Sequence, residues 1–209
     1  LNPNPSFASV YLPKIESNRP ERMPIPLATI RTIQEECREL DDEARWLIAL
    51  LSDTGMRLSE ALGLQASDII TQNGIPSVSI QESQWRPLKT KSSARTIPLV
   101  GAALWASERL LESSDNGLLF PKYCDGQNTK SNSASAALNK WLKPRVPDGC
   151  VIHSFRHSLR DRLRAIECPA DIIDAIGGWT TEGIGHQYGQ GHSLALKFKW
   201  LEQTVLKGG

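Results

Sequence analysis

The stretch from residue 153 to residue 188 constrains the fold more than any other part of the chain. His153 and Arg156 stand three residues apart, so on a helix both side chains project from one face, about one turn apart. Pro169 suits the first turn of a second helix, and Gly177-Gly178 is typical of a helix end. The stretch therefore predicts two consecutive helices, the first of which presents a cationic or hydrogen-bonding pair to a single point. We expect an anion at that point.

The segments before this stretch predict a mainly helical domain. In residues 27–40, Ile30, Ile33 and Cys37 recur at helical intervals and share one face. Residues 42–55 are apolar enough to form a central helix. Helices are expected over residues 27–40, 42–55, 59–64, 101–113 and 131–142.

The pattern changes between Asp68 and Pro98, where short β-like runs alternate with turn residues. The runs are Ile69-Ile70, Val78 with Ile80, and Thr96-Ile97, and the turn residues are Asn73-Gly74, Pro76 and Pro87. Three strands in one antiparallel sheet are the simplest account. The predicted fold class is therefore α+β, mainly α-helical with a small three-stranded antiparallel β-sheet.

The two ends of the chain differ from its middle. Residues 1–26 contain Pro3, Pro5, Pro13, Pro20, Pro24 and Pro26, too many for a helix, and indicate an extended linker. A chain of 209 residues can bury one substantial core, so we expect a single domain over residues 27–191. In the tail, residues 192–209, a helical stripe competes with a strand-like alternation, and we favour the helix. The stripe is Leu194, Phe198, Leu201 and Val205, and the alternation is Leu196, Phe198 and Trp200.

The charge of the chain is unevenly distributed. A net charge of +1 alone does not indicate nucleic-acid binding, but residues 35–60 are rich in Asp and Glu, whereas two other segments are basic. The first basic group is Arg86, Lys89, Lys91 and Arg95, and the second is Lys122, Lys130, Lys140, Lys143 and Arg145. Such segregation fits one basic face toward a phosphate backbone, although solvated surface side chains are the usual explanation of any single run.

The sequence favours a cytosolic protein without metal or disulfides. It has no apolar run long enough to cross a bilayer and no secretion signal at its start. Its four cysteines are far apart and show no CxxC pair, which favours reduced thiols. His153 and His157 have the spacing of a zinc pair, but HSFRH lacks the Glu of HExxH and no third ligand is evident. The cysteines are Cys37, Cys124, Cys150 and Cys168.

Three segments, in order along the chain, resemble motifs of the tyrosine recombinase (phage integrase) family. Residues 51–64, LSDTGMRLSEALGL, resemble the box of the family's first arginine, here Arg57, with Glu60 as its accompanying acid. Residues 88–99, LKTKSSARTIPL, resemble the hairpin that carries the family's active-site lysine. Lys89 fits that position best, and Lys91 is a close rival.

The third segment resembles the family's C-terminal signature. It contains the HxxR pattern from His153 to Arg156, and Tyr188 nine residues after Trp179. Trp179 stands where most relatives have a second histidine. Its indole N–H can still donate one hydrogen bond to phosphate, but it cannot shuttle a proton.

The resemblance implies a catalytic set and a role for each member. It consists of Arg57, Lys89, His153, Arg156, Trp179 and Tyr188, with Glu60 and Lys91 in possible support. Arginine suits phosphate because its planar fork donates two hydrogen bonds while it stays charged. A phenol titrates near pH ~10 in isolation, so a tyrosine nucleophile needs neighbouring cations to lose its proton. A lysine would protonate the departing 5′ oxygen, and His153 would assist proton transfer at the tyrosine or hydrogen-bond the phosphate.

The resemblance also implies a function. It is site-specific recombination of double-stranded DNA at attachment sites, by cleavage and rejoining through a 3′-phosphotyrosine. The type would be the integrase of a prophage or genomic island in the bacterial cytoplasm. No cofactor is needed, because the phosphotyrosine stores the bond energy. The family further implies an N-terminal core-binding domain before the linker, and a homotetramer on DNA held together through the C-terminal tail.

Three other functions compete with this one. The first is a DNA-binding member of the family that has lost catalysis. The second is a topoisomerase IB-like enzyme that uses similar chemistry on one strand at a time. The third, less favoured, is a metal-dependent hydrolase built on His153 and His157.

Overall fold

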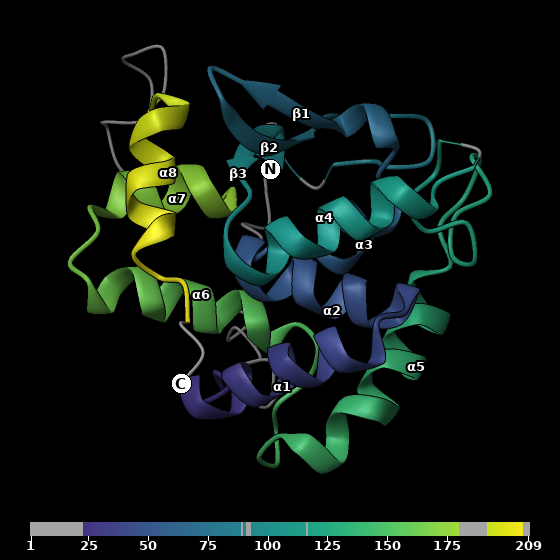
Figure 1. Cartoon of the computed structure of the whole chain (residues 1–209), viewed down its shortest axis with the longest axis horizontal. Coiled ribbons are helices and arrows are strands. Elements are labelled where there is room, and N and C mark those ends of the chain that lie inside the picture. The colour runs from purple at the N-terminus through teal and green to yellow at the C-terminus, as the bar shows by residue number, and fades with distance from the viewer. Residues whose placement is uncertain (1–22, 89, 91–92, 116, 180–191, 207–209) are drawn as a thin grey trace, which may run out of the picture.

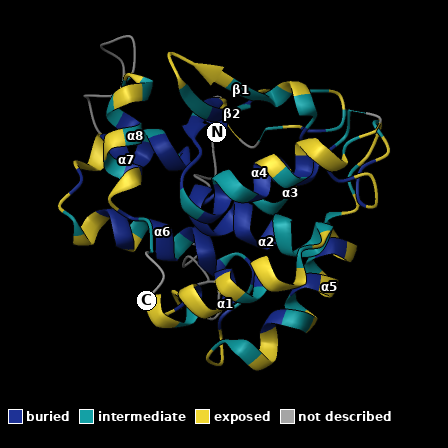
Figure 2. Cartoon of the chain, viewed as in Figure 1, coloured by how far each residue is buried: buried dark blue, intermediate teal, exposed yellow. Residues whose placement is uncertain are grey.

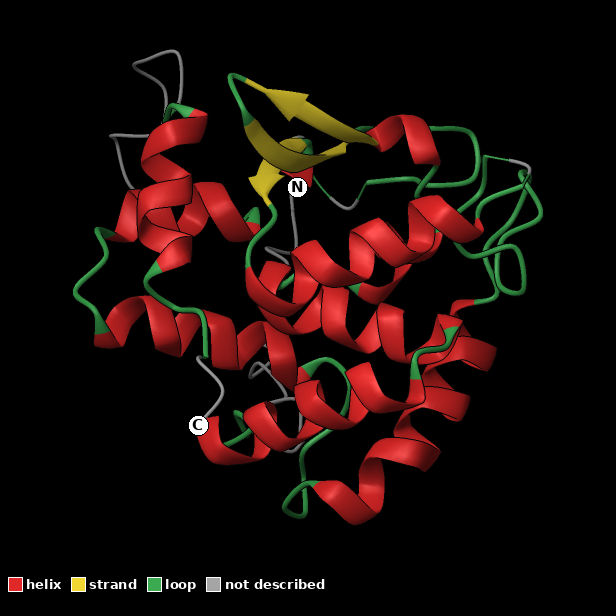
Figure 3. Ribbon diagram, viewed as in Figure 1, coloured by secondary structure: helices red, strands yellow, loops and turns green. Residues whose placement is uncertain are grey.

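The computed structural model describes residues 23–88, 90, 93–115, 117–179 and 192–206, which form helices with a small sheet at one edge of the molecule (Figures 1 and 3). The α-helices are α1 (Leu27–Leu40), α2 (Glu43–Thr54), α3 (Leu58–Leu62), α4 (Gly101–Ser113), α5 (Ser131–Leu142), α6 (Ser154–Ala165), α7 (Ala170–Gly177) and α8 (Leu194–Glu202). Two short 3₁₀ helices are η1 (Ala66–Asp68) and η3 (Lys143–Arg145). The strands are β1 (Ile69–Gln72), β2 (Ile75–Ile80) and β3 (Arg95–Pro98).

Helix α2 lies at the centre of the molecule. It packs against α1, α3, α4 and α6, and every residue from Leu47 to Thr54 is buried (Figure 2). The side chain of Asp42 caps its start by accepting a hydrogen bond from the backbone N–H of Arg45, and Gly55 ends it in the left-handed conformation at φ 61°. The segment that contains Arg57 therefore leaves the core at a fixed point.

A buried ion pair joins α2 to the helix that carries Arg156. Arg162 of α6 donates to Asp53 Oδ1 at 2.9 Å, and it also donates to the backbone carbonyls of Ser52 and Thr204. The other oxygen of Asp53 accepts from the backbone N–H of Ala102, at the start of α4, at 2.9 Å. Because both charges are buried and paired with each other, this ion pair fixes α6 against α2 and α4.

The sheet has the order β1-β2-β3, and both of its strand pairs are antiparallel. Val78 pairs with Ile97 and Ile80 pairs with Arg95, so Arg95 belongs to the buried side of β3. Helices α7 and α8 pack against β3, where Lys197 of α8 donates to the carbonyl of Thr96 at 2.9 Å.

The predicted fold class is confirmed, and so are the positions of its elements. The predicted strands coincide with β1, β2 and β3, and Ile30, Ile33 and Cys37 form the buried face of α1. The tail forms a helix, α8, but its predicted stripe is only partly right: the buried residues of α8 are Lys197 and Leu201. The division of the chain into linker, catalytic domain and tail stays a prediction.

The basic groups predicted from the charge pattern differ in exposure. Arg86 and Arg95 do not belong to a basic surface: they are only 4% and 7% exposed, and each pairs with a carboxylate. The prediction failed there because composition cannot distinguish a solvated arginine from one in a buried ion pair. In the second group, Lys122, Lys130, Lys140 and Lys143 are exposed, whereas Arg145 is half-buried and pairs with Glu36 at 2.7 Å.

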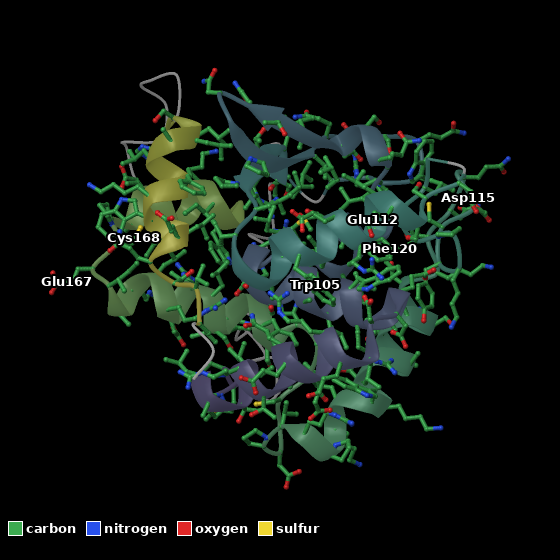
Figure 4. The ribbon with its side chains drawn as sticks, in the orientation of Figure 1. Trp105, Glu112, Asp115, Phe120, Glu167 and Cys168 are labelled. Carbon is green, nitrogen blue, oxygen red and sulfur yellow. The ribbon has the colours of Figure 1, made fainter. Side chains whose placement is uncertain are left out.

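The turn between α6 and α7 reverses the chain within a few residues. Glu167 adopts a left-handed φ of 60° there, and its side chain points away from the molecule (Figure 4). Cys168 follows and is buried, and its thiol is free, as are those of Cys37, Cys124 and Cys150. Within the described parts of the chain, no helix is long and apolar enough to cross a membrane.

Candidate active site

Arg57 lies at the start of α3, where the chain leaves the core. It occupies the N-cap position, and its backbone N–H donates to Glu60 Oε2 at 2.9 Å. Its guanidinium donates to Glu60 Oε1 at 2.5 Å and to the hydroxyl of Ser93 at 3.0 Å. The side chain keeps 22% of its surface exposed, so it is held in place while part of the guanidinium remains accessible. Glu60, the acid expected to accompany Arg57, thus contacts both its backbone N–H and its guanidinium.

Arg156 projects from the first turn of α6 toward the same place. It is 4% exposed, and Nη1 donates to the carbonyl of Gly55, two residues before Arg57, at 2.6 Å. Among the described residues, its Nη2 finds no hydrogen-bond acceptor. Burial, and then the guanidinium groups of Arg57 and Arg95, lower the pKa of Arg156 to about 9. The group therefore stays charged at neutral pH, and a bound anion would stabilise it.

Trp179 covers the guanidinium of Arg156. Its ring centre lies 4.3 Å from Cζ of Arg156 and 5.2 Å from Cζ of Arg160, which follows one turn later on α6. The aromatic ring thus fixes the plane of Arg156 from the side of α7.

Two glycines make this position of Trp179 possible. Gly178 ends α7 at φ 64°, and its backbone N–H and that of Trp179 both donate to the carbonyl of Asp174. A Cβ on Gly177 would lie 1.8 Å from the Trp179 ring, so the ring folds back over the space that a side chain would fill. The predicted helix end at Gly177-Gly178 is confirmed, and its consequence is the position of Trp179.

His153 precedes α6 and occupies its N-cap position. Its side chain makes no capping hydrogen bond to the start of α6. Its ring meets that of His157 edge-on, with the ring centres 5.3 Å apart. Among the described residues, no group of three or more His, Cys, Asp or Glu side chains is placed to hold a metal ion.

Three residues of the predicted set, Lys89, Lys91 and Tyr188, lie outside the described residues. Two residues beside the lysines in the sequence, Thr90 and Ser93, are described. Their hydroxyls lie 3.1 Å apart, and that of Ser93 also contacts Arg57. Ser93, two residues after Lys91 in the sequence, therefore lies beside Arg57, the first arginine of the site.

Sequence reasoning missed Arg95, which lies behind Arg57. It donates to Glu60 Oε2 at 3.0 Å, so one carboxylate serves two guanidinium groups. Burial alone would raise the pKa of Glu60, but Arg95 and then Arg57 lower it below its ordinary value. A signal was available: in a strand, residues two apart share a face, and Ile97 is plainly a core residue.

The described part of the site therefore carries an excess of positive charge. Arg57, Arg95 and Arg156 converge from α3, β3 and α6, and Glu60 is the carboxylate between them. After these contacts, the partly accessible guanidinium of Arg57 and the Nη2 donor of Arg156 are left to contact a ligand. Arg57 and Arg156 can bind a tetrahedral anion, and the excess positive charge can stabilise negative charge that develops on it.

Solved structures of DNA-rearranging proteins share this fold at low sequence identity. The integrase of the Tn1549 transposon, in complex with transposon right end DNA, is 18% identical with a TM-score of 0.59, over 89% of this chain and 63% of its own. The XerH site-specific recombinase bound to palindromic difH substrate is 20% identical with a TM-score of 0.54, over 86% of this chain and 49% of its own. The XerA recombinase is 18% identical with a TM-score of 0.51, over 98% of this chain and 62% of its own. The chain thus spans less than two thirds of each of these proteins.

Comparison with protein families gives a match over most of the chain. No curated protein sequence matches at a significant level. The family model described as the phage integrase family matches residues 26–192, which include every residue of the predicted catalytic set. The chain belongs to the phage integrase family.

Proposed function

We propose that this protein carries out site-specific recombination of DNA by cleaving and rejoining strands through a 3′-phosphotyrosine at Tyr188. The observation that carries the proposal is the convergence of Arg57 and Arg156, which lie far apart in the sequence. Arg156 donates to the carbonyl of Gly55 at 2.6 Å, and the charge of Arg57 acts on Arg156. The resemblance to the family supplies the role of Tyr188.

The cleavage step follows from the charges of the site. The phenol of Tyr188 gives up its proton, for which His153 is the proposed acceptor, and its oxygen attacks phosphorus. The bond from phosphorus to the 5′ oxygen breaks, and a proton from a lysine passes to that oxygen. We assign this proton to Lys89, with Lys91 as the alternative. In the second step a 5′ hydroxyl gives its proton to the same lysine and attacks the phosphotyrosine, the bond to the tyrosine oxygen breaks, and Tyr188 regains its proton from His153. Arg57 and Arg156 bind the phosphate throughout, and the indole N–H of Trp179 adds a donor.

DNA is the proposed partner, and the solved structures support it. The Tn1549 integrase and XerH structures contain DNA. We extend the proposal to attachment sites of a mobile element and to a homotetramer on DNA. In the structure of the single chain, α8 packs against β3 of its own domain. Contact of the tail with a neighbour would therefore require α8 to leave β3 or to use its outer face.

A covalent trapping experiment tests the function. A nicked suicide substrate carrying the attachment site loses the 5′-hydroxyl fragment after cleavage, so the protein stays joined to the 3′ phosphate. We expect an adduct from the natural protein and none from Tyr188→Phe. Tyr123→Phe is the matched control, because Tyr123 is a buried tyrosine outside the site. DNA binding without any adduct would favour the inactive DNA-binding member.

Two further assays separate the remaining alternatives. Relaxation of a supercoiled plasmid that lacks the attachment site would favour the topoisomerase IB-like enzyme. DNA cleavage that leaves no adduct, is lost in EDTA and recovers on adding a divalent metal would favour a hydrolase built on His153 and His157. We expect no relaxation of that plasmid and an undiminished adduct in EDTA.

A further inference from the structure

Arg95 has more partners than a charge-neutralising arginine needs. Its Nη2 and Nη1 donate to the two oxygens of Glu60 at 3.0 and 3.4 Å, and Nη1 also donates to the carbonyl of Ser93 at 2.7 Å. Its Nε donates to the carbonyl of Ile176 at 2.9 Å. The guanidinium thus uses its planar shape to contact three separate segments at once.

Each of these segments carries or adjoins a residue of the site. Glu60 holds both the backbone N–H and the guanidinium of Arg57. The hydroxyl of Ser93 contacts Arg57 from the other side. Ile176 is the penultimate residue of α7, three residues before Trp179. One buried side chain therefore joins the start of α3 to the end of α7.

The end of α7 is built to admit this side chain. A Cβ on Gly178 would lie 2.8 Å from Nη1 of Arg95, and the φ of 64° is one that side chains rarely adopt. Gly178 thus allows the guanidinium to reach the helix end.

We propose that Arg95 is a positioning residue that fixes Arg57 and Trp179 relative to each other. It does not contact the phosphate, because it is buried behind Glu60 and only 7% exposed. Arg57 and the Trp179–Arg156 pair come from different elements, α3 on one side and α6 with α7 on the other. Arg95 links Glu60 to the end of α7, and removing its side chain removes both of these hydrogen bonds. Only the catalytic test of this role rests on the recombination proposed above.

Arg86 provides a matched control. It lies in the same region, is 4% exposed, and forms a buried ion pair with Asp68 at 2.7 Å. Its other bonds go to the carbonyls of Gly63 and Gln81, neither of which belongs to the site. Each of the variants Arg86→Gln and Arg95→Gln therefore removes a buried ion pair. Only Arg95→Gln also removes hydrogen bonds to segments that carry or adjoin site residues.

The catalytic experiment measures the single-turnover rate of adduct formation at saturating protein, at a temperature where all variants are folded. We expect Arg95→Gln to slow it by about tenfold to a hundredfold, as displacement of reacting groups does, and Arg86→Gln to change it by less than about threefold. The affinity for DNA should stay within about threefold, because Arg95 does not touch it. Arg95→Lys should stay slow, since an ammonium cannot span all three segments. Equal slowing in Arg86→Gln, or the natural rate in Arg95→Lys, would overturn the proposal.

Hydrogen exchange gives a second readout that needs no activity. In Arg95→Gln we expect faster amide exchange both at residues 57–60 and at residues 174–179, whereas Arg86→Gln should leave both segments protected. If the natural protein gives no adduct, the proposed function fails while this measurement still decides the role of Arg95. Unchanged exchange in either segment of Arg95→Gln would refute it.

Discussion

Arg156→Met should stabilise the protein while it abolishes DNA cleavage. Because the pKa of Arg156 is lowered to about 9, charging it in the folded site costs roughly 5 kcal/mol more than in the unfolded chain. Its hydrogen bond to Gly55 and its contact with Trp179 offset about 2–4 kcal/mol of that cost. Methionine is long enough to remain in contact with the Trp179 ring. The expected gain is therefore about 1–3 kcal/mol, or about 2–4 °C in Tm for each kcal/mol.

Arg162→Met is the matched control on the same helix. Arg162 is as buried as Arg156, but it pairs with Asp53 at 2.9 Å. Its removal leaves a buried carboxylate without its cation, so we expect a loss of about 3–5 kcal/mol. Urea unfolding of both variants without DNA measures the two changes. If Arg156→Met destabilises the protein as Arg162→Met does, the claim that Arg156 is held at a cost is wrong.

The pH dependence has a definite sign. Because the pKa of Arg156 in the folded protein, about 9, lies below that of an arginine in the unfolded chain, the folded protein binds fewer protons than the unfolded chain above about pH 9. The stability of the natural protein should therefore rise relative to Arg156→Met above about pH 9. The advantage of the variant should be constant from about pH 6 to pH 8.

Three further predictions concern the rest of the site and the basic surface. Gly177→Ala places a methyl group where the Trp179 ring lies and should slow adduct formation at least about tenfold, measured on the suicide substrate. Glu60→Gln removes a carboxylate whose pKa is lowered, so its contribution to stability, present above about pH 4.3, is lost as the pH falls through the lower folded value. Urea unfolding from neutral to acid pH should show the stability difference shrinking. Lys140→Gln and Lys143→Gln, on the exposed basic surface, should each lower the slope of log Kd against log salt by about one, measured by fluorescence anisotropy.

Local patterns were sufficient to predict the elements of the fold. The helical spacing of Ile30, Ile33 and Cys37 and the alternation in the sheet depend on neighbours within a few residues. The buried ion pairs were beyond that reach. Glu60 and Arg95 are 35 positions apart, and Asp53 and Arg162 are 109 apart, so nothing in either local sequence names the partner. Arg95 was consequently assigned to a basic surface.

The convergence of the site was predicted by resemblance alone. Spacing placed His153 and Arg156 on one helix, but only the folded chain brings Arg156 to the carbonyl of Gly55, 101 positions away. The fold of Trp179 over Gly177 is also a tertiary effect, because a glycine pair predicts a helix end without saying what fills the space left by the missing side chain.

The charges around Arg156 suggest why the site maintains a costly arginine. The side chains whose charges act on it are Arg57, Arg95, Arg160 and Glu60, and Arg160 lies 3.8 Å from Asp174. Counting Arg156 itself, four positive and two negative charges leave an excess of two among the described residues. A phosphodiester carries one negative charge, and in the cleavage proposed above the attacking phenolate adds a second at the transition state. A site with two excess positive charges matches the charge of that transition state better than the charge of the bound DNA. Such a difference accelerates the reaction.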